Sequence, residues 1–174
     1  MDKAEYSDPV CCFDASQYMG HPDTEPCASA VNVPEIVKEL DRLQNSGQLG
    51  QAQRLLEHEV CAARQSGDWR SELSLQSEFM GLHRRTGDKA AARSAVARGL
   101  ELIRRHRLGT TVSGATIMLN AATTMKFLGL SAEALPIFRH VSRVYSETLD
   151  PGDYRFAGLY NNMALAFEDT GDYD

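Results

Sequence analysis

Residues 160–174, YNNMALAFEDTGDYD, decide the fold class. Met163, Ala166 and Phe167 return at helical spacing, so they share one apolar face. Gly171 follows, and glycine can take the left-handed backbone conformation that ends a helix. We therefore expect a helix over residues 154–170 that has just reached its turn.

Glycines recur upstream at a regular interval: Gly47, Gly87, Gly129 and Gly171 lie 40, 42 and 42 residues apart. Five residues after the first three of these stand the alanines Ala52, Ala92 and Ala134. A small side chain at that point lets two helix axes approach closely. Self-similarity at this period predicts a helical solenoid, with two helices per repeat and the glycine in the turn between them.

Apolar periodicity and turn residues predict seven helices, over residues 34–46, 50–65, 69–86, 89–107, 112–128, 132–149 and 154–170. Pro34 suits the first turn of the first helix. Asp68, Asp88 and Ser131 are predicted as N-caps of three later helices. The expected fold class is therefore all-α.

The last helix and turn closely resemble a tetratricopeptide repeat. The residues that fall on its Trp, Leu, Gly, Tyr, Gly and Tyr positions are Tyr160, Met163, Ala164, Phe167, Gly171 and Tyr173. The preceding repeat matches through Asn120, Ala121, Ala122, Gly129, Ala134 and Phe138. The longer period, the pair Asn161-Asn162 and the EALP sequence at residues 133–136 resemble the kinesin-light-chain type, and the architecture resembles bacterial multi-repeat proteins.

The resemblance implies a right-handed α-α superhelix of antiparallel helix pairs. It covers residues 34–174, about three and a half repeats, and is stronger in the last two repeats than in the first two. Residues 1–33 form an N-terminal extension that we expect to cap the first helix pair. Because the motif continues with a second helix, we expect the chain to be cut after the first helix of its last repeat. That helix should then expose Leu159, Met163, Ala166 or Phe167 and favour self-association.

Composition excludes several classes of partner. The chain of 174 residues has a formal net charge of -6, which argues against nucleic acid and against an anionic membrane surface. No apolar run approaches the roughly 18 residues of a membrane span, and no secretory signal opens the chain. The basic run at residues 104–107 complements the dipole at a helix C-terminus. We expect a cytoplasmic protein.

The cysteine pattern does not predict a disulfide framework or a metal site. Three of the four cysteines, Cys11, Cys12 and Cys27, lie in the first 27 residues, with His21 between them. Their spacing matches no zinc signature, so we expect no metal and no cofactor. The alternative, an enzyme or metal protein built on this segment, stays open to elemental analysis.

The resemblance also implies a ligand groove, lined by the first helix of each pair. Asn120 and Asn162 occupy the same position one repeat apart, and an amide can both donate to and accept from a peptide backbone. An alternative is that these asparagines tie neighbouring helices together. Arg84, Arg85 and Lys126 would favour an acidic peptide segment, unless they form a solvated helix end. The predicted peptide-binding residues are Asn120, Asn162, Asn161, Thr116, Thr123, Lys126, Arg84, Arg85 and Glu78.

These features predict a non-enzymatic scaffold that binds a protein or peptide segment. The alternative is a regulatory module that senses a short peptide, with an effector domain outside these residues.

Overall fold

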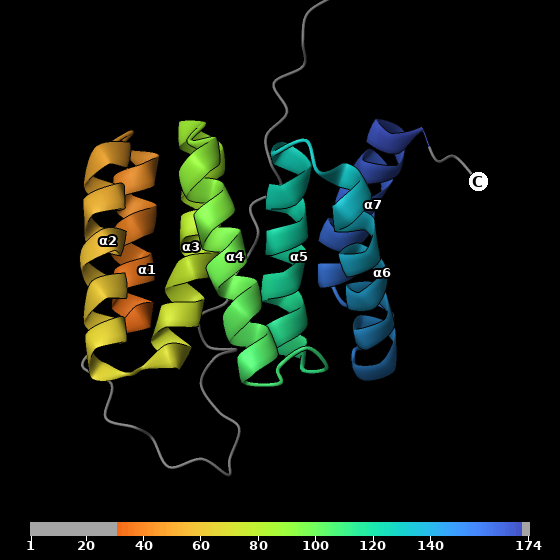
Figure 1. Cartoon of the computed structure of the whole chain (residues 1–174), viewed down its shortest axis with the longest axis horizontal. Coiled ribbons are helices and arrows are strands. Elements are labelled where there is room, and N and C mark those ends of the chain that lie inside the picture. Colours follow the sequence, from red (N-terminus) through yellow and green to blue (C-terminus); the bar gives the residue numbers. More distant parts are fainter. Residues whose placement is uncertain (1–30, 172–174) are drawn as a thin grey trace, which may run out of the picture.

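The computed structural model describes residues 31–171, and this part of the chain is all-α, without strands (Figure 1). Its seven helices are α1 (Val33–Asn45), α2 (Leu49–Ser66), α3 (Trp69–Thr86), α4 (Lys89–Arg105), α5 (Val112–Phe127), α6 (Ser131–Thr148) and α7 (Arg155–Thr170). Each begins and ends within two residues of the predicted bounds. The predicted fold class is therefore confirmed.

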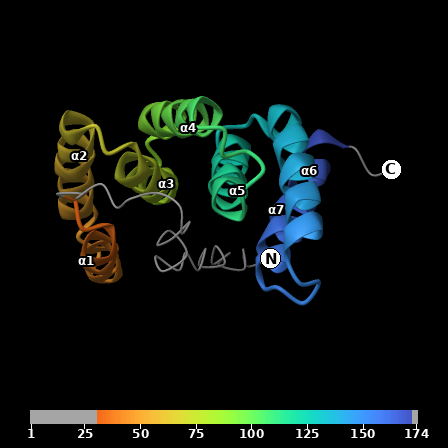
Figure 2. The same ribbon diagram turned by 90° about the horizontal axis from the view of Figure 1, so that it is seen from below.

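The helices stand side by side and are joined alternately at the two ends of the array (Figure 1). Seen along the helices, α1, α3, α5 and α7 lie on one side and α2, α4 and α6 on the other (Figure 2). We call the first set the inner row and the second the outer row. This alternation is what antiparallel helix pairs predict, whereas the right-handed superhelical twist stays a prediction.

The turns within the pairs depend on glycine, as expected. Gly47, Gly87 and Gly129 have φ values of 72°, 77° and 79°, in the left-handed region where a Cβ is unfavourable. Gly171 has the same conformation, with φ of 69°, after the last helix. The alanines that follow the first three glycines, Ala52, Ala92 and Ala134, are all 0% exposed. The repeat therefore has a physical basis in both the turn and the close helix crossing.

Two of the three predicted N-caps are confirmed. The carboxylates of Asp68 and Asp88 accept hydrogen bonds from the backbone N–H groups of Ser71 and Ala91, at 3.1 and 3.0 Å. The prediction for Ser131 is wrong, because α6 begins one residue earlier than expected and Ser131 is its first residue. Its hydroxyl instead donates to Asp169 Oδ2 at 2.7 Å, which joins α6 to α7.

The core has two main parts along the array. The first lies among α1 to α4, around fully buried Leu40, Leu56 and Leu75. The second lies among α5 to α7, around Phe138 and Tyr145. Helix α3 is buried on most sides, since α1, α2, α4 and α5 all pack against it.

The prediction that the last helix exposes its apolar face is wrong for Leu159 and Ala166. Both are 0% exposed, because they belong to the core shared with α5 and α6. Met163 and Phe167 are half-buried against the same core. The large hydrophobic side chain exposed on α7 is Tyr160, at 52%. Self-association through this helix stays a prediction.

An ion-pair cluster around the buried side chain of Glu72 joins three helices. Glu72 on α3 has a side chain only 3% exposed, and it accepts hydrogen bonds from Arg64 on α2 and Arg98 on α4. The distances are 2.5 Å from Arg64 Nε, 2.8 Å from Arg98 Nε and 2.7 Å from Arg98 Nη2. We call this the Glu72 cluster.

Candidate functional site

The predicted peptide-binding residues all lie on the inner row, on α3, α5 and α7. Arg84, Arg85 and Glu78 belong to α3, and Asn161 and Asn162 belong to α7. The remaining four, Thr116, Asn120, Thr123 and Lys126, belong to α5. They differ in how far their polar atoms are already engaged in hydrogen bonds within the protein.

Asn120 lies at the contact between α3 and α5 and is 7% exposed. Its Nδ2 donates to both the backbone oxygen and the hydroxyl of Ser77, each at 2.9 Å. Its Oδ1 accepts from Arg84 Nη1 at 2.7 Å, and the same nitrogen donates to Thr124 Oγ1 at 2.6 Å. The amide therefore ties neighbouring helices together, which was the alternative interpretation of this residue. A peptide would have to displace these bonds to use it.

These bonds connect neighbouring levels of successive repeats. Ser77 and Asn120 are 43 residues apart, and Arg84 and Thr124 are 40 residues apart. Both separations equal the glycine period within a few residues. The period had placed Ser77 and Asn120 at neighbouring levels of successive repeats, but nothing in it indicated that they would bond to each other.

The asparagine pair on α7 is split between buried and exposed environments. Asn162 is 8% exposed, and its Nδ2 donates to the backbone oxygen of Gly158 in the same helix, at 2.9 Å. Asn161 is exposed. Of the two, Asn161 is therefore the one more exposed to a ligand.

The threonines of α5 bond to their own helix. Thr116 Oγ1 contacts the backbone oxygen of Val112 and also Tyr145 Oη on α6, each at 2.9 Å, so it belongs to the α5–α6 contact. Thr123 Oγ1 donates to the backbone oxygen of Leu119 at 2.8 Å. Because each hydroxyl is already hydrogen-bonded to a backbone oxygen of its own helix, it is less able to bind a ligand.

Glu78 is the electrostatically unusual residue of the inner row. Burial raises the pKa of Glu78 to about 7, the Asp41 carboxylate on α1 acts in the same direction, and Arg84 acts against both. The residue as a whole is partly exposed, so a ligand can approach it. A carboxyl group that titrates near neutral pH can accept a hydrogen bond when ionised and donate one when protonated.

The other two predicted basic residues, Arg85 and Lys126, differ in their exposure to solvent. Arg85 is exposed, and its Nη1 donates to Gln44 Oε1 at 2.8 Å, which links α3 to α1. Lys126 is half-buried near the end of α5. With Arg84 bound to Asn120 and Thr124, Arg85 and Lys126 are the predicted basic groups best placed to meet an acidic ligand.

Within residues 31–171, no three His, Cys, Asp or Glu side chains gather as a metal site. Cys61, the cysteine of this range, is an exposed thiol. Cys11, Cys12, His21 and Cys27, and most of the expected N-terminal cap, lie outside the described residues. A search of the same part of the chain finds no helix with the length and apolar character that a membrane span requires.

Comparison with known proteins adds no family: no protein-family model matches the chain, and no curated protein matches it either. The likeness to tetratricopeptide repeats therefore depends on the residues of the motif and on the arrangement of the helices.

Proposed function

We propose that this protein is a non-enzymatic scaffold of the tetratricopeptide type that binds a peptide or protein segment along its inner row. The observation that carries the proposal is the pair of α3–α5 bonds between residues within one or two positions of equivalence in successive repeats, Ser77 with Asn120 and Arg84 with Thr124. Repeats stacked in register present equivalent side chains at regular intervals, and an extended peptide also repeats regularly.

The binding residues that we propose are those of the inner row with reachable polar groups. They combine hydrogen-bonding groups with both signs of charge: Glu78, Arg85, Lys126 and Asn161. Asn120 and Arg84 hold α3 against α5 beneath this surface, and so they position it. The expected ligand is an extended segment with acidic residues that can meet Arg85 and Lys126.

We further propose a cytoplasmic location. The exposed free thiol of Cys61 supports it, because an exposed cysteine is better suited to a reducing compartment than to an oxidising one.

Selection of random peptides displayed on phage tests the proposed function. Peptides that bind the full chain should lose affinity at least fivefold when Lys126 is changed to Glu or Asn161 to Ala. The matched control is Arg54→Glu, which reverses an exposed charge on the outer row and should leave affinity unchanged. Equal binding by all three variants would place the peptide on another surface and contradict the proposal.

A further inference from the structure

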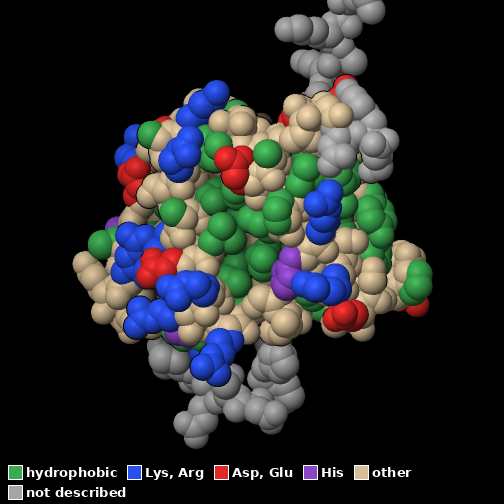
Figure 3. Space-filling model, turned by 45° about the vertical axis from the view of Figure 1, so that its right-hand side comes forward, with side chains coloured by type: hydrophobic (Ala, Val, Ile, Leu, Met, Phe, Trp, Pro, Cys, Tyr) green, Lys and Arg blue, Asp and Glu red, His purple; other side chains and the backbone are tan. Residues whose placement is uncertain are grey.

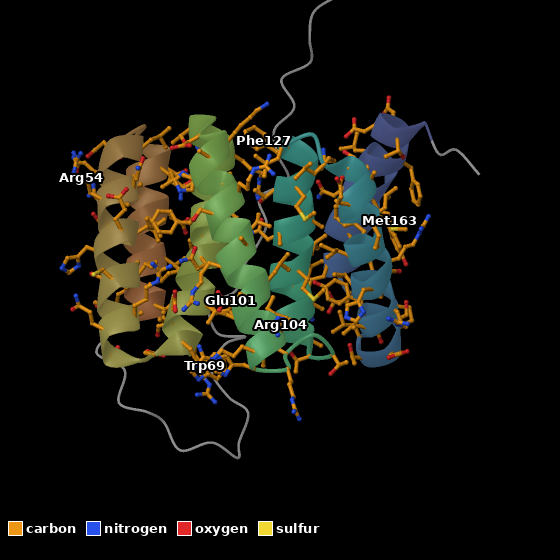
Figure 4. All side chains as sticks on the ribbon, viewed as in Figure 1. Arg54, Trp69, Glu101, Arg104, Phe127 and Met163 are labelled. Carbon is orange, nitrogen blue, oxygen red and sulfur yellow. The ribbon has the colours of Figure 1, made fainter. Side chains whose placement is uncertain are left out.

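A second surface lies at the other end of the array from the glycine turns within the helix pairs, where α3 begins and α4 ends. The indole of Trp69 stacks on the imidazole of His106, with ring centroids 3.8 Å apart and planes 7° apart. The guanidinium carbon of Arg70 lies 4.3 Å from the centre of the same indole. Because the imidazole fills one face of the indole, the guanidinium must cover the other. Figure 4 shows Trp69 and Arg104 at this end of the array.

Three further arginines flank His106 in the sequence. Arg104, Arg105 and Arg107 are exposed, and none of them forms an ion pair with an acidic side chain within residues 31–171. The nearest acidic group of α4, Glu101, is already paired with Arg98 at 2.9 Å. Lys and Arg side chains gather at the lower left of the face in Figure 3, with few acidic side chains among them.

The local potential is positive although the chain as a whole is acidic. Burial lowers the pKa of His106, and the charges of Arg105, Arg70 and Arg98 lower it further. Residues 89–107 contain six Lys or Arg against one Glu, whereas the whole chain has a formal net charge of -6. We call Trp69, Arg70, Arg104, Arg105, His106 and Arg107 together the arginine surface.

The backbone at Arg107 is strained. Its φ is 55°, and it is the one non-glycine residue of the described range with positive φ. At five other turns in that range the left-handed position is filled by glycine: Gly47, Gly67, Gly87, Gly129 and Gly171. A side chain held in this conformation costs folding free energy, and such strain concentrates at functional positions. The turn alone therefore does not explain why arginine, and not glycine, stands at position 107.

We propose that the arginine surface binds an acidic segment of a partner protein through its carboxylates. Guanidinium groups bind carboxylates with two parallel hydrogen bonds, and several unpaired arginines at one place can hold several acidic residues. This site is distinct from the peptide-binding residues proposed on the inner row and does not depend on the function proposed for them.

Two observations favour an acidic protein segment over nucleic acid. Both faces of the Trp69 indole are covered, by His106 and by Arg70, so no base can stack on it. The basic region is also confined to one end of an acidic protein, and a long polyanion would extend past it onto surfaces that repel it.

Trp69 is the one tryptophan of the chain, so its fluorescence reports on the arginine surface directly. We would titrate the full chain with a synthetic decapeptide of glutamate, a decapeptide of glutamine and a ten-residue thymidine oligonucleotide. The glutamate peptide should change the emission saturably, and binding should weaken as salt is added. The glutamine peptide should have no effect.

The triple variant Arg104→Gln/Arg105→Gln/Arg107→Gln should bind the glutamate peptide roughly tenfold to a hundredfold more weakly. The exposed outer-row change Arg54→Gln is the matched control and should bind normally. No response to the glutamate peptide, or equal binding by the triple variant, would overturn the proposal. Tighter binding of the oligonucleotide than of the peptide would overturn the choice of an acidic protein segment.

Arg107→Gly separates strain from binding. Glycine should raise the melting temperature by about 3 °C, because it relieves the positive φ. The same variant should bind the glutamate peptide at least threefold more weakly. A more stable variant with unchanged affinity would contradict a binding role for Arg107.

Discussion

Replacing Glu72 with glutamine should weaken the α2–α3–α4 packing while leaving the shape of the side chain unchanged. Glu72 is 3% exposed and accepts three hydrogen bonds from Arg64 and Arg98. Glutamine keeps one acceptor but turns an N–H donor toward a guanidinium that also donates. The variant therefore loses both the charge and at least one hydrogen bond.

The expected cost follows from the burial of the three partners. Hydrogen bonds to charged groups contribute about 1.5–3 kcal/mol each, and breaking a fully buried pair costs about 3–5 kcal/mol. Arg64 and Arg98 are 50% and 28% exposed, so their charges can turn partly to water. We therefore expect Glu72→Gln to lower the free energy of unfolding by about 2 kcal/mol.

Urea denaturation, monitored by circular dichroism at the helical minimum, measures this change in the free energy of unfolding. The matched control is Glu39→Gln, which removes the exposed Glu39–Arg42 pair at 2.6 Å and should leave the free energy of unfolding nearly unchanged. A loss for Glu72→Gln no larger than that of the control, with the dependence on urea unchanged, would refute the view that the cluster joins three helices.

The pH dependence provides a second check on the same residue. Burial raises the pKa of Glu72, but the hydrogen bonds and charges of Arg98 and Arg64 lower it more, so the pKa lies below 4.5. The stabilisation is therefore present above the pKa of the unfolded chain and is lost as the pH falls through the folded pKa. The difference between wild type and Glu72→Gln should shrink in acid.

Three further substitutions test other parts of the structure. Glu78→Gln should stabilise the fold at pH 8 by about 1–3 kcal/mol and leave its stability unchanged near pH 4. The reason is that the folded pKa of Glu78 is raised to about 7, so the wild type loses stability as the pH rises from 4.5 through 7. Melting curves of wild type and variant that coincide across this pH range would contradict the prediction. Gly114→Ala should cost more than about 2 kcal/mol in urea, because a Cβ there would lie 2.1 Å from the backbone oxygen of Leu108. Gly81→Ala, in the interior of α3 with nothing within 4 Å of its Cβ, should instead gain about 0.5–1 kcal/mol, and a loss at Gly81 would show that the space is filled.

The sequence predicted the helices well because local signals agree with the tertiary structure. The left-handed glycines end helices whatever surrounds them, and the alanines after them are buried by the helix crossing that they permit. The two aspartate caps were also predictable, because each cap's hydrogen bond spans only a single turn of backbone. The prediction that Ser131 is an N-cap was wrong because a helix start that shifts by one residue also shifts the cap position by one residue.

The details of the inner row were less predictable, because they depend on contacts between repeats. The period placed Asn120 on the inner row. Whether its amide is free for a peptide or bonded to Ser77 and Arg84 depends on side-chain distances that the period does not give. The ion-pair cluster around buried Glu72 also escaped prediction, since Arg64, Glu72 and Arg98 lie on three helices with no common spacing. The strain at Arg107 has no signal in the sequence, where a basic residue at a helix end is ordinary.

This geometry changes how the asparagine prediction can be tested. An Asn120→Ala/Asn162→Ala variant should lower peptide affinity, but it also removes bonds between α3 and α5. A melting curve of the variant must therefore accompany its binding data, and changes at Lys126 and Asn161 test the surface with less disturbance of the packing.

We propose that the inner row binds an extended peptide, and nuclear magnetic resonance can locate that peptide on the chain. A peptide selected by display would be titrated into the isotope-labelled chain, and the amide shifts would be followed residue by residue. We predict that the largest changes fall on α3, α5 and α7, around Glu78, Lys126 and Asn161. Changes confined to the outer row, on α2, α4 and α6, or the absence of any selected peptide that binds, would contradict the claim.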